Sequence, residues 1–266
     1  MAKIGFIGMG NMGTAIMRGL LKTYQPEELL FTSAHEAKMQ KITEETGVAH
    51  VSTANECAEQ VKYLVLAVKP QVLPIVFKEL NGKIRKDQVV ISIAAGYAIA
   101  DLQAGLGESA RIVRSMPNTP AMVGEGMSGV SYDENLFTDE EKQVIDGFFT
   151  SFGKMEKVDE KLMDVVGSAS GCSPAYVYMF IEALADGCVK NGLPRQAAYK
   201  MVAQAVLGSA KMVLETGKHP GELKDMVCSP GGTTIEGLAA LEENGFRGAI
   251  IKACDANFEK NKKLKG

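Results

Sequence analysis

The sequence contains no tryptophan, only three histidines and five cysteines among its 266 residues. The cysteines are odd in number and widely scattered, and no two of them form a Cys-x-x-Cys pair. This pattern argues against a disulfide framework and favours reduced thiols in the cytoplasm. The histidines (His35, His50 and His219) lack metal-ligand spacing with one another or with the cysteines. We therefore expect no metal site.

Long hydrophobic runs and a strong charge imbalance are also absent. No apolar run approaches the length of a membrane span, and Lys3 leads directly into an apolar stretch. We therefore expect no membrane association and no secretory signal. The net charge of -3 gives no attraction to nucleic acid. The one basic cluster is typical of a helix end, where cations complement the helix dipole: Lys260, Lys262, Lys263 and Lys265.

A glycine-rich turn near the N-terminus is the most informative motif that is present. Residues 3–13 read Lys-Ile-Gly-Phe-Ile-Gly-Met-Gly-Asn-Met-Gly, a pattern that predicts a strand, a Gly-x-Gly-x-x-Gly turn and a helix. Gly8 allows the tight turn, Gly10 lets the backbone approach a pyrophosphate, and Gly13 lets the helix pack on the strand. The helix N-terminus then faces the phosphates. This context predicts a dinucleotide site, and the alternative is a turn without a ligand.

Short apolar runs alternate with helical patterns over the first part of the chain, and the strand signals then stop. Residues 63–68 are apolar on both faces, which indicates a strand covered by helices on both sides. We predict an α/β fold, a Rossmann-like, doubly wound, mostly parallel sheet followed by a smaller all-helical dimerisation domain. The expected domains are residues 1–159 and 160–266. Expected strands are 3–7, 29–32, 49–51, 63–68, 89–93, 111–115, 127–131 and 154–158, and expected helices include 71–80, 139–149, 173–190, 194–215, 233–243 and 246–263.

The end of the second expected strand indicates which dinucleotide is used. NAD-selective sites place an acidic residue there, which accepts hydrogen bonds from the ribose 2′-hydroxyl. Here residues 32–35 read Thr-Ser-Ala-His, and Glu36 comes slightly late. Ser33, His35 and Lys38 could all donate to a 2′-phosphate. We therefore expect NADPH to be preferred, with NADH possible.

Three further loops should follow strands at their carboxyl ends, where open α/β sheets bind ligands. They cover residues 67–71, 93–96 and 116–120. Lys69 offers a cation in the first loop, and the small residues of the second leave room for a flat ring. Asn118 lies between two prolines in the third, which holds its amide in a fixed place. Ordinary turn chemistry is the alternative for each loop.

A second glycine-rich loop lies in the helical part of the chain. Residues 229–234 read Ser-Pro-Gly-Gly-Thr-Thr and precede an expected helix. Free N–H groups and hydroxyls at such a helix start can bind a carboxylate. A capped turn between two helices is the alternative.

Taken in order, these segments resemble those of pyrroline-5-carboxylate reductases. The resemblance rests on residues 7–12, 67–70 and 117–120, and above all on Val-Cys-Ser-Pro-Gly-Gly-Thr-Thr at 227–234 followed by Gly237 and Leu238. It covers nearly the whole chain. It implies NAD(P)H-dependent hydride transfer to L-1-pyrroline-5-carboxylate, giving L-proline in the last step of proline biosynthesis. The implied partners are this small molecule and a second copy of the chain in a homodimer, and the family often forms larger rings of dimers.

The resemblance also implies the site residues. Thr234 would orient the substrate by a hydrogen bond to its ring nitrogen, and we take Asn118 as a second candidate for the catalytic centre. The substrate would be held by Ser229, Pro230, Gly231, Gly232, Thr233 and Thr234. The cofactor would be lined by Ile7, Gly8, Met9, Gly10, Asn11, Met12, Ser33, Asn55, Ala67, Val68, Lys69, Pro70, Ile93, Ala94 and Ala95.

One segment departs from the family pattern. Where the family usually reads Ser-Gly-Ser-Gly-Pro, this chain has Cys172 and Ser173 in place of the second serine and second glycine. The loss of a glycine removes backbone freedom and favours a helix cap. The departure affects the detail of this turn and not the expected activity.

The sequence shows no obvious catalytic acid or base, no Ser-His-Asp set and no paired carboxylates. Reduction of a cyclic imine does not need a catalytic acid or base, because the imine can enter already protonated and leave as a neutral amine. Catalysis is then mostly a matter of positioning the reactants. Two other functions stay open. One is a β-hydroxyacid dehydrogenase, such as a hydroxyisobutyrate dehydrogenase, with Lys190 as its acid–base group. The other is a regulator that binds NADPH without turnover.

Overall fold

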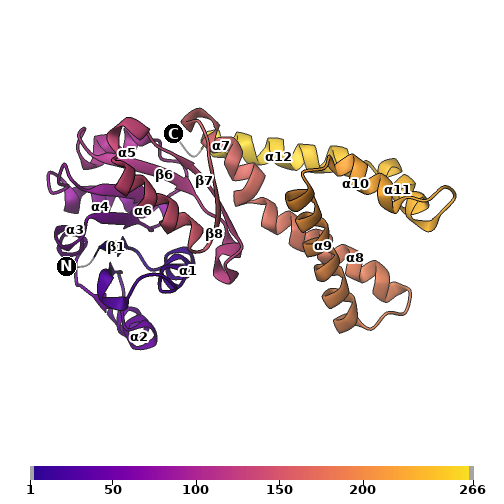
Figure 1. Cartoon of the computed structure of the whole chain (residues 1–266), viewed down its shortest axis with the longest axis horizontal. Helices are drawn as coiled ribbons and strands as arrows, with labels where there is room; N and C mark the ends of the chain where they lie inside the picture. The colour runs from indigo at the N-terminus through magenta and orange to yellow at the C-terminus, as the bar shows by residue number, and fades with distance from the viewer. Residues whose placement is uncertain (1–2, 264–266) are drawn as a thin grey trace. The chain divides into compact units, whose positions relative to one another are not determined.

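The computed structural model describes residues 3–263 of the chain. The chain divides into two compact units, and Figure 1 labels most of their helices and several of the strands. The first unit runs to Cys172 and includes the end of the chain from Asn257, and the second is Ser173–Ala256. Within the described range, no helix is long and apolar enough to cross a membrane.

The first unit is built on an eight-stranded sheet in the order β3-β2-β1-β4-β5-β6-β7-β8. Neighbouring strands pair in parallel, whereas β6 and β7 pair antiparallel. The expected mostly parallel sheet is confirmed, and each expected strand is present with small differences at its ends. The strands are β1 (Ile4–Ile7), β2 (Leu29–Thr32), β3 (Ala49–His50), β4 (Tyr63–Leu66), β5 (Val89–Ser92), β6 (Arg111–Met116), β7 (Gly126–Ser131) and β8 (Gly153–Lys157).

Both faces of the sheet are covered at its centre, because successive side chains of β1, β2, β4, β5 and β6 enter different cores. In β4, Tyr63 and Val65 pack in one core, and Leu64 and Leu66 pack in the other. This arrangement explains why these strands are apolar throughout. The first core includes side chains of α1 (Asn11–Leu20), α2 (Glu36–Thr46) and α6 (Asp139–Thr150), and the second those of α3 (Ala54–Gln60), α4 (Leu73–Leu80) and α5 (Ile99–Leu106).

A buried ionic group joins the start of α6 to the sheet. Thr138 caps the helix as expected, and its hydroxyl accepts a hydrogen bond from the Glu141 N–H at 3.2 Å. Arg111 of β6 donates two hydrogen bonds to the Glu141 carboxylate, at 2.7 and 3.0 Å, and the Lys62 ammonium lies 3.1 Å from it. The hydrogen bonds from Arg111 are the main reason why the pKa of Glu141 falls to about 2. The buried Glu141 carboxylate is therefore charged and is paired with the cations of Arg111 and Lys62.

The first unit extends beyond the boundary expected after residue 159. Short helical segments follow β8, among them α7 (Met163–Val166) and a π-helical turn (Gly167–Gly171). Arg114 of β6 is only 4% exposed and holds this stretch through Glu160 at 3.3 Å and Asp164 at 3.4 Å. These ion pairs make the stretch part of the first compact unit. The division into sequence domains at 159/160 stays a prediction.

The second unit is helical, as expected. The sequence pattern predicts each of its helices except α10, whose eight residues give too little periodicity to be recognised. Gly217 closes α9 in a left-handed conformation (φ 62°), which glycine adopts without strain. The helices are α8 (Ser173–Lys190), α9 (Arg195–Thr216), α10 (Pro220–Val227), α11 (Thr233–Glu243) and α12 (Phe246–Lys263), the last of which ends in the first unit.

The core of the second unit is small for five helices. Its buried cluster consists of Ala185, Ala198 and Val202 among the described side chains. Many large apolar side chains on these helices remain exposed to solvent, which in a single chain leaves extensive apolar surface without cover. They include Tyr178, Met179, Phe180, Leu184, Met201, Leu207, Leu214, Met226, Val227 and Ile251.

We predict that Glu141→Gln lowers the free energy of unfolding by about 2–4 kcal/mol, because Arg111 then lacks its charged partner in a buried place. Urea unfolding measures the change. Glu140→Gln removes the same charge from an exposed neighbour and should cost less than about 0.5 kcal/mol.

The same pair of variants has a defined pH dependence. The folded pKa of Glu141, about 2, lies below its ordinary value of 4.5. Its stabilising contribution is therefore present above about pH 4.5 and is lost as the pH falls toward 2. The difference between the wild type and Glu141→Gln should shrink over that range. Equal destabilisation by the two substitutions at neutral pH would contradict the role given to this pair.

Candidate functional site

The glycine-rich turn after β1 is closely packed on one side and open on the other. Gly8 has a φ of +97°, and a Cβ there would lie 2.7 Å from Val68 Cγ1. A Cβ at Gly13 would lie 2.7 Å from the Gly8 carbonyl oxygen, whereas a Cβ at Gly10 would meet nothing within 4 Å. The roles expected for Gly8 in the turn and for Gly13 in packing are thus confirmed. The space above Gly10 is free for a ligand.

The N-terminus of α1 opens into this free space. Gly10 precedes the helix in an extended conformation, and no side chain caps the helix start. The first helical hydrogen bond runs from the Thr14 N–H to the Gly10 carbonyl at 3.0 Å. The N–H groups of Asn11, Met12 and Gly13 therefore have no helical partner, and such groups bind anions, phosphates above all.

A cavity of about 210 Å³ lies beside the turn. It has mostly apolar walls, which suit a flat aromatic ring. Its lining includes Ile7 and Gly8 from the turn, Ser33 from the end of β2, Ala54 from the start of α3, and Val68 and Ile75 after β4. The turn, the end of β2 and the loop after β4 are thus brought together, as the sequence predicts for a dinucleotide site.

Asn55 follows Ala54 on α3, next to this cavity. Its amide nitrogen donates to the Glu59 carboxylate at 2.8 Å. Its amide oxygen is buried and has no hydrogen-bond partner among the described residues. A buried amide oxygen without a partner is unfavourable, so a ligand donor here would stabilise it. The contact of Asn55 with the cofactor stays a prediction.

The loops after β4, β5 and β6 lie at the same edge of the sheet as the glycine turn. The Ala67 N–H donates to the Ile7 carbonyl at 2.8 Å, and the Ile93 N–H donates to the Leu66 carbonyl at 3.2 Å. These bonds continue the parallel register to the ends of β1, β4 and β5. Residues 67–70 and 93–95 therefore follow adjacent strands at the same edge of the sheet. Lys69 is exposed there, and Ala94 is buried. Their contacts with a cofactor stay predictions.

Asn118, the second candidate for the catalytic centre, has structural partners on both sides of its amide. Its nitrogen donates to the Ser170 carbonyl at 3.0 Å, and its oxygen accepts from the Met127 N–H at 2.8 Å. The side chain is buried. Asn118 thus ties the loop after β6 to β7 and to the π-helical turn. A direct contact of Asn118 with substrate stays a prediction.

The segment that departs from the family pattern is held by the end of α12. The Ser168 hydroxyl donates to the Asn257 amide oxygen at 2.8 Å, and the Asn257 amide nitrogen donates to Cys172 Sγ. Asn261 donates to the Asp164 carbonyl at 3.3 Å. Cys172 Sγ thus accepts a hydrogen bond that a serine hydroxyl at this position could also accept. Sequence reasoning missed Asn257 and Asn261, because nothing local links them to this turn.

The second glycine-rich loop joins α10 to α11 in the second unit. Gly231 has a φ of +66°, and the Gly232 N–H donates to the Ser229 carbonyl at 3.0 Å. A Cβ at Gly232 would lie 2.4 Å from Ser229 Oγ. The N–H groups of Thr233 and Thr234 lie in the first turn of α11 and therefore have no helical partner. No side chain caps this helix start either. This loop fits a small anionic ligand such as a carboxylate.

Comparison with known proteins identifies the family. Residues 160–264 match the model described as pyrroline-5-carboxylate reductase dimerisation, and residues 3–96 match the model described as NADP oxidoreductase, coenzyme F420-dependent. The pyrroline-5-carboxylate reductase of Escherichia coli (strain K12) is 47% identical over 264 residues, which cover 98% of each protein. The chain belongs to the pyrroline-5-carboxylate reductase family.

Solved structures of pyrroline-5-carboxylate reductases have the same fold over the whole chain. One from Coxiella burnetii is 33% identical with a TM-score of 0.91, and the match covers 100% of this chain and 99% of that chain. The Plasmodium falciparum protein, solved with NADP bound, is 34% identical with a TM-score of 0.89 and coverage of 100% and 98%. Both units of this chain therefore have counterparts within the family.

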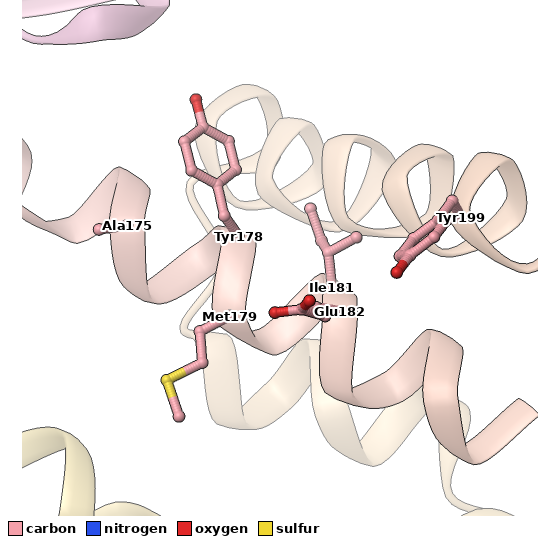
Figure 2. A pocket seen from close by; sticks show the side chains of 6 residues that line it. All are labelled: Ala175, Tyr178, Met179, Ile181, Glu182 and Tyr199. Carbon is pink, nitrogen blue, oxygen red and sulfur yellow. The ribbon is translucent and has the colours of Figure 1, made fainter.

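Family membership explains the exposed apolar faces of the second unit. A hollow of about 510 Å³ lies on α8 and α9, lined by Ala175, Tyr178, Met179, Ile181, Glu182 and Tyr199 (Figure 2). Its aromatic and apolar side chains are of the kind that protein interfaces bury. They lie within the region that matches the dimerisation model. The chain forms oligomers through this region.

We predict opposite effects for two substitutions in the glycine turn. The Cβ of Gly10→Val has no atom within 4 Å, so this variant should leave the Tm nearly unchanged while it weakens dinucleotide binding at least tenfold, or by about 1.4 kcal/mol. Gly13→Val places its Cβ against the Gly8 carbonyl and should lower the Tm by several degrees, as overpacking of about 1–3 kcal/mol does. Thermal unfolding and fluorescence titration measure the two effects. Unchanged dinucleotide affinity of Gly10→Val would place the ligand elsewhere.

Proposed function

We propose that the protein reduces L-1-pyrroline-5-carboxylate to L-proline, with NADPH as the preferred hydride donor and NADH as a possible one. The observation that carries the proposal is the presence of two sites of different chemistry in one chain. A dinucleotide turn lies in the first unit, and a loop suited to a carboxylate lies in the second. The end-to-end similarity to pyrroline-5-carboxylate reductases supports reading them as the two halves of one reaction.

The residues of the first unit fit a nicotinamide dinucleotide. The N–H groups at the start of α1 would bind its pyrophosphate, the cavity that includes Ser33 would hold its adenosine, and the small residues after β5 would leave room for the nicotinamide. The buried amide oxygen of Asn55, which has no hydrogen-bond partner among the described residues, could accept a hydrogen bond from the dinucleotide. When bound, the cofactor supplies the hydride. The protein's part is to hold it in place and to keep water away from the transfer.

The residues of the second unit fit the substrate. The N–H groups of Thr233 and Thr234, with the Ser229 hydroxyl, bind the carboxylate, and the Thr234 hydroxyl orients the ring nitrogen. No acid or base is needed, because the imine enters protonated and the hydride converts it to a neutral amine. Catalysis then consists of holding the reacting carbons about 3–3.5 Å apart.

Two other functions make different demands on the chain. A β-hydroxyacid dehydrogenase needs an acid–base group, and the candidate that the sequence offers for it, Lys190, is the exposed last residue of α8. A regulator that binds NADPH without turnover does not need a substrate-binding loop such as the one at residues 229–234. The decrease of NADPH absorbance with pyrroline-5-carboxylate, compared with hydroxyisobutyrate semialdehyde, separates the three functions. Turnover with the semialdehyde alone, or binding without turnover, refutes the proposal.

We predict that Thr234→Ala raises the KM for pyrroline-5-carboxylate and lowers kcat several-fold without abolishing turnover, because the hydroxyl orients and does not transfer protons. Thr234→Ser keeps the hydroxyl and should recover most of both parameters. Steady-state kinetics measure the split between KM and kcat. Complete loss of activity in a folded Thr234→Ala protein would require an acid–base role for this residue.

The assembly and location are further parts of the proposal. We infer a homodimer built through the second unit, with a ring of dimers as the larger assembly, in the cytoplasm. The exposed apolar side chains of α8 and α9 support the dimer. Light scattering at micromolar concentration should give at least twice the mass of one chain. A monomeric mass would contradict the dimer, and a mass of only two chains would contradict the ring.

A further inference from the structure

A network of side-chain hydrogen bonds joins the end of α12 to the loop after β6 within the first unit. Asn257 and Asn261 lie one turn apart on α12 and therefore share a face of this helix. A Cβ at Gly167 would lie 2.7 Å from Asn261 Nδ2, so this face packs directly on the π-helical turn. The π-helical turn contacts Asn118, a candidate for the catalytic centre, through the Ser170 carbonyl.

Asn257 bridges the two ends of the π-helical turn with the two polar atoms of its amide. Its oxygen accepts a hydrogen bond from the Ser168 hydroxyl at 2.8 Å, and its nitrogen donates to Cys172 Sγ at 2.8 Å. Ser168 is only 6% exposed, so its hydroxyl needs hydrogen-bond partners within the protein. Ser170 lies midway between these two contacts. Asn257 therefore holds both sides of the residue that Asn118 binds.

The Ser170 carbonyl is open to Asn118 because its usual helical donor is missing. Its α-helical donor would be the N–H of residue 174, which is a proline and has none. Within the turn, the Cys172 N–H bonds to the Gly167 carbonyl at 2.8 Å, five residues back, which is the spacing of a π-helix. The Asn118 amide nitrogen donates to the Ser170 carbonyl at 3.0 Å. The position of Asn118 thus depends on the position of this turn.

The loop after β6 that contains Asn118 borders the proposed dinucleotide site on two sides. Because β6 runs parallel to β5, this loop leaves the sheet at the same edge as residues 93–95, the proposed place of the nicotinamide. The segment that follows Asn118, Thr119–Val123, packs against α1. Its Met122 lines the same hollow, of about 410 Å³, as Asn11 at the start of α1.

We propose that Asn257 is a positioning residue for the hydride transfer, which fixes Asn118 and its loop through the π-helical turn. The inference rests on the proposed function and adds to it a residue that acts through another side chain. Without the Asn257 amide, the Ser168 hydroxyl and Cys172 Sγ both lose a hydrogen bond, and the turn between them can shift. Small displacements near a reaction centre lower the rate, because the reacting atoms must stay about 3–3.5 Å apart.

Steady-state kinetics of the full-length protein with NADPH and pyrroline-5-carboxylate test this inference in a double-mutant cycle. Asn257→Ala should lower kcat about tenfold, as a displaced reaction centre does, and Asn118→Ala should lower it at least as much. The double variant should be no slower than Asn118→Ala alone, because Asn257 acts only through Asn118. Calorimetric titration should give Asn257→Ala an NADPH affinity within about twofold of the wild type, since the glycine turn keeps its contacts.

Two controls separate positioning from stability. Asp255→Ala truncates an exposed side chain of similar size on the same helix and should leave kcat within about twofold of the wild type. Thr138→Ala removes the cap of α6 in the same unit, so it should lower the Tm and leave kcat within the same limits. If Asn257→Ala does not fold, Ser168→Ala takes its place, because it removes one of the two hydrogen bonds of Asn257, and it should lower kcat several-fold.

Three results would overturn the role of Asn257. The first is an unchanged kcat in a folded Asn257→Ala, or in Ser168→Ala where Asn257→Ala does not fold. The second is a double variant in which the losses of Asn257→Ala and Asn118→Ala multiply. The third is an equal loss of kcat in Thr138→Ala at an equal loss of Tm. In each case turnover by the wild type leaves the proposed function intact. A wild type that does not reduce pyrroline-5-carboxylate would overturn the proposed function and this inference with it.

Discussion

The close approach of α1 to the ends of β1 and β4 is the constraint on which the rest of the site depends. A Cβ at Gly13 would lie 2.7 Å from the Gly8 carbonyl, and one at Gly8 would lie 2.7 Å from Val68. A side chain at Gly13 would push the helix away from the turn, and one at Gly8 would collide with the loop after β4. Because neither is present, the helix N-terminus lies directly at the carboxyl ends of the strands. The apolar cavity and the open space over Gly10 lie beside this closely packed turn.

Local sequence patterns predicted most of the fold and could not predict the contacts that shape the site. Strands such as β4 were recognisable because burial on both faces leaves a continuous apolar run, and Thr138 was recognisable as a cap because capping is local. Partners far apart in sequence leave no such signal. Asn118 binds the carbonyl of Ser170, 52 residues away, and His50 meets Glu36 across 14 residues. Strand direction is equally invisible, so the antiparallel pairing of β7 with β6 came from the structure.

The two units differ in what stabilises them. The first has a core on each face of its sheet and an internal ion pair between Arg111 and Glu141. The second buries little more than Ala185, Ala198 and Val202 and exposes large apolar side chains on its helices. The proposed dinucleotide site therefore lies in a unit with a core of its own. The proposed substrate loop at residues 229–234 lies in a unit whose exposed apolar side chains a second chain would cover.

In the proposed reaction a hydride passes from the dinucleotide to the imine carbon, and the protein acts by holding the reactants in place. NADPH deuterated at the transferred position of its nicotinamide tests this transfer. With pyrroline-5-carboxylate in ordinary water, we expect proline with one deuterium on the former imine carbon, the ring carbon next to nitrogen. Proline without deuterium, its new hydrogen drawn from solvent, would show that the hydride does not pass directly.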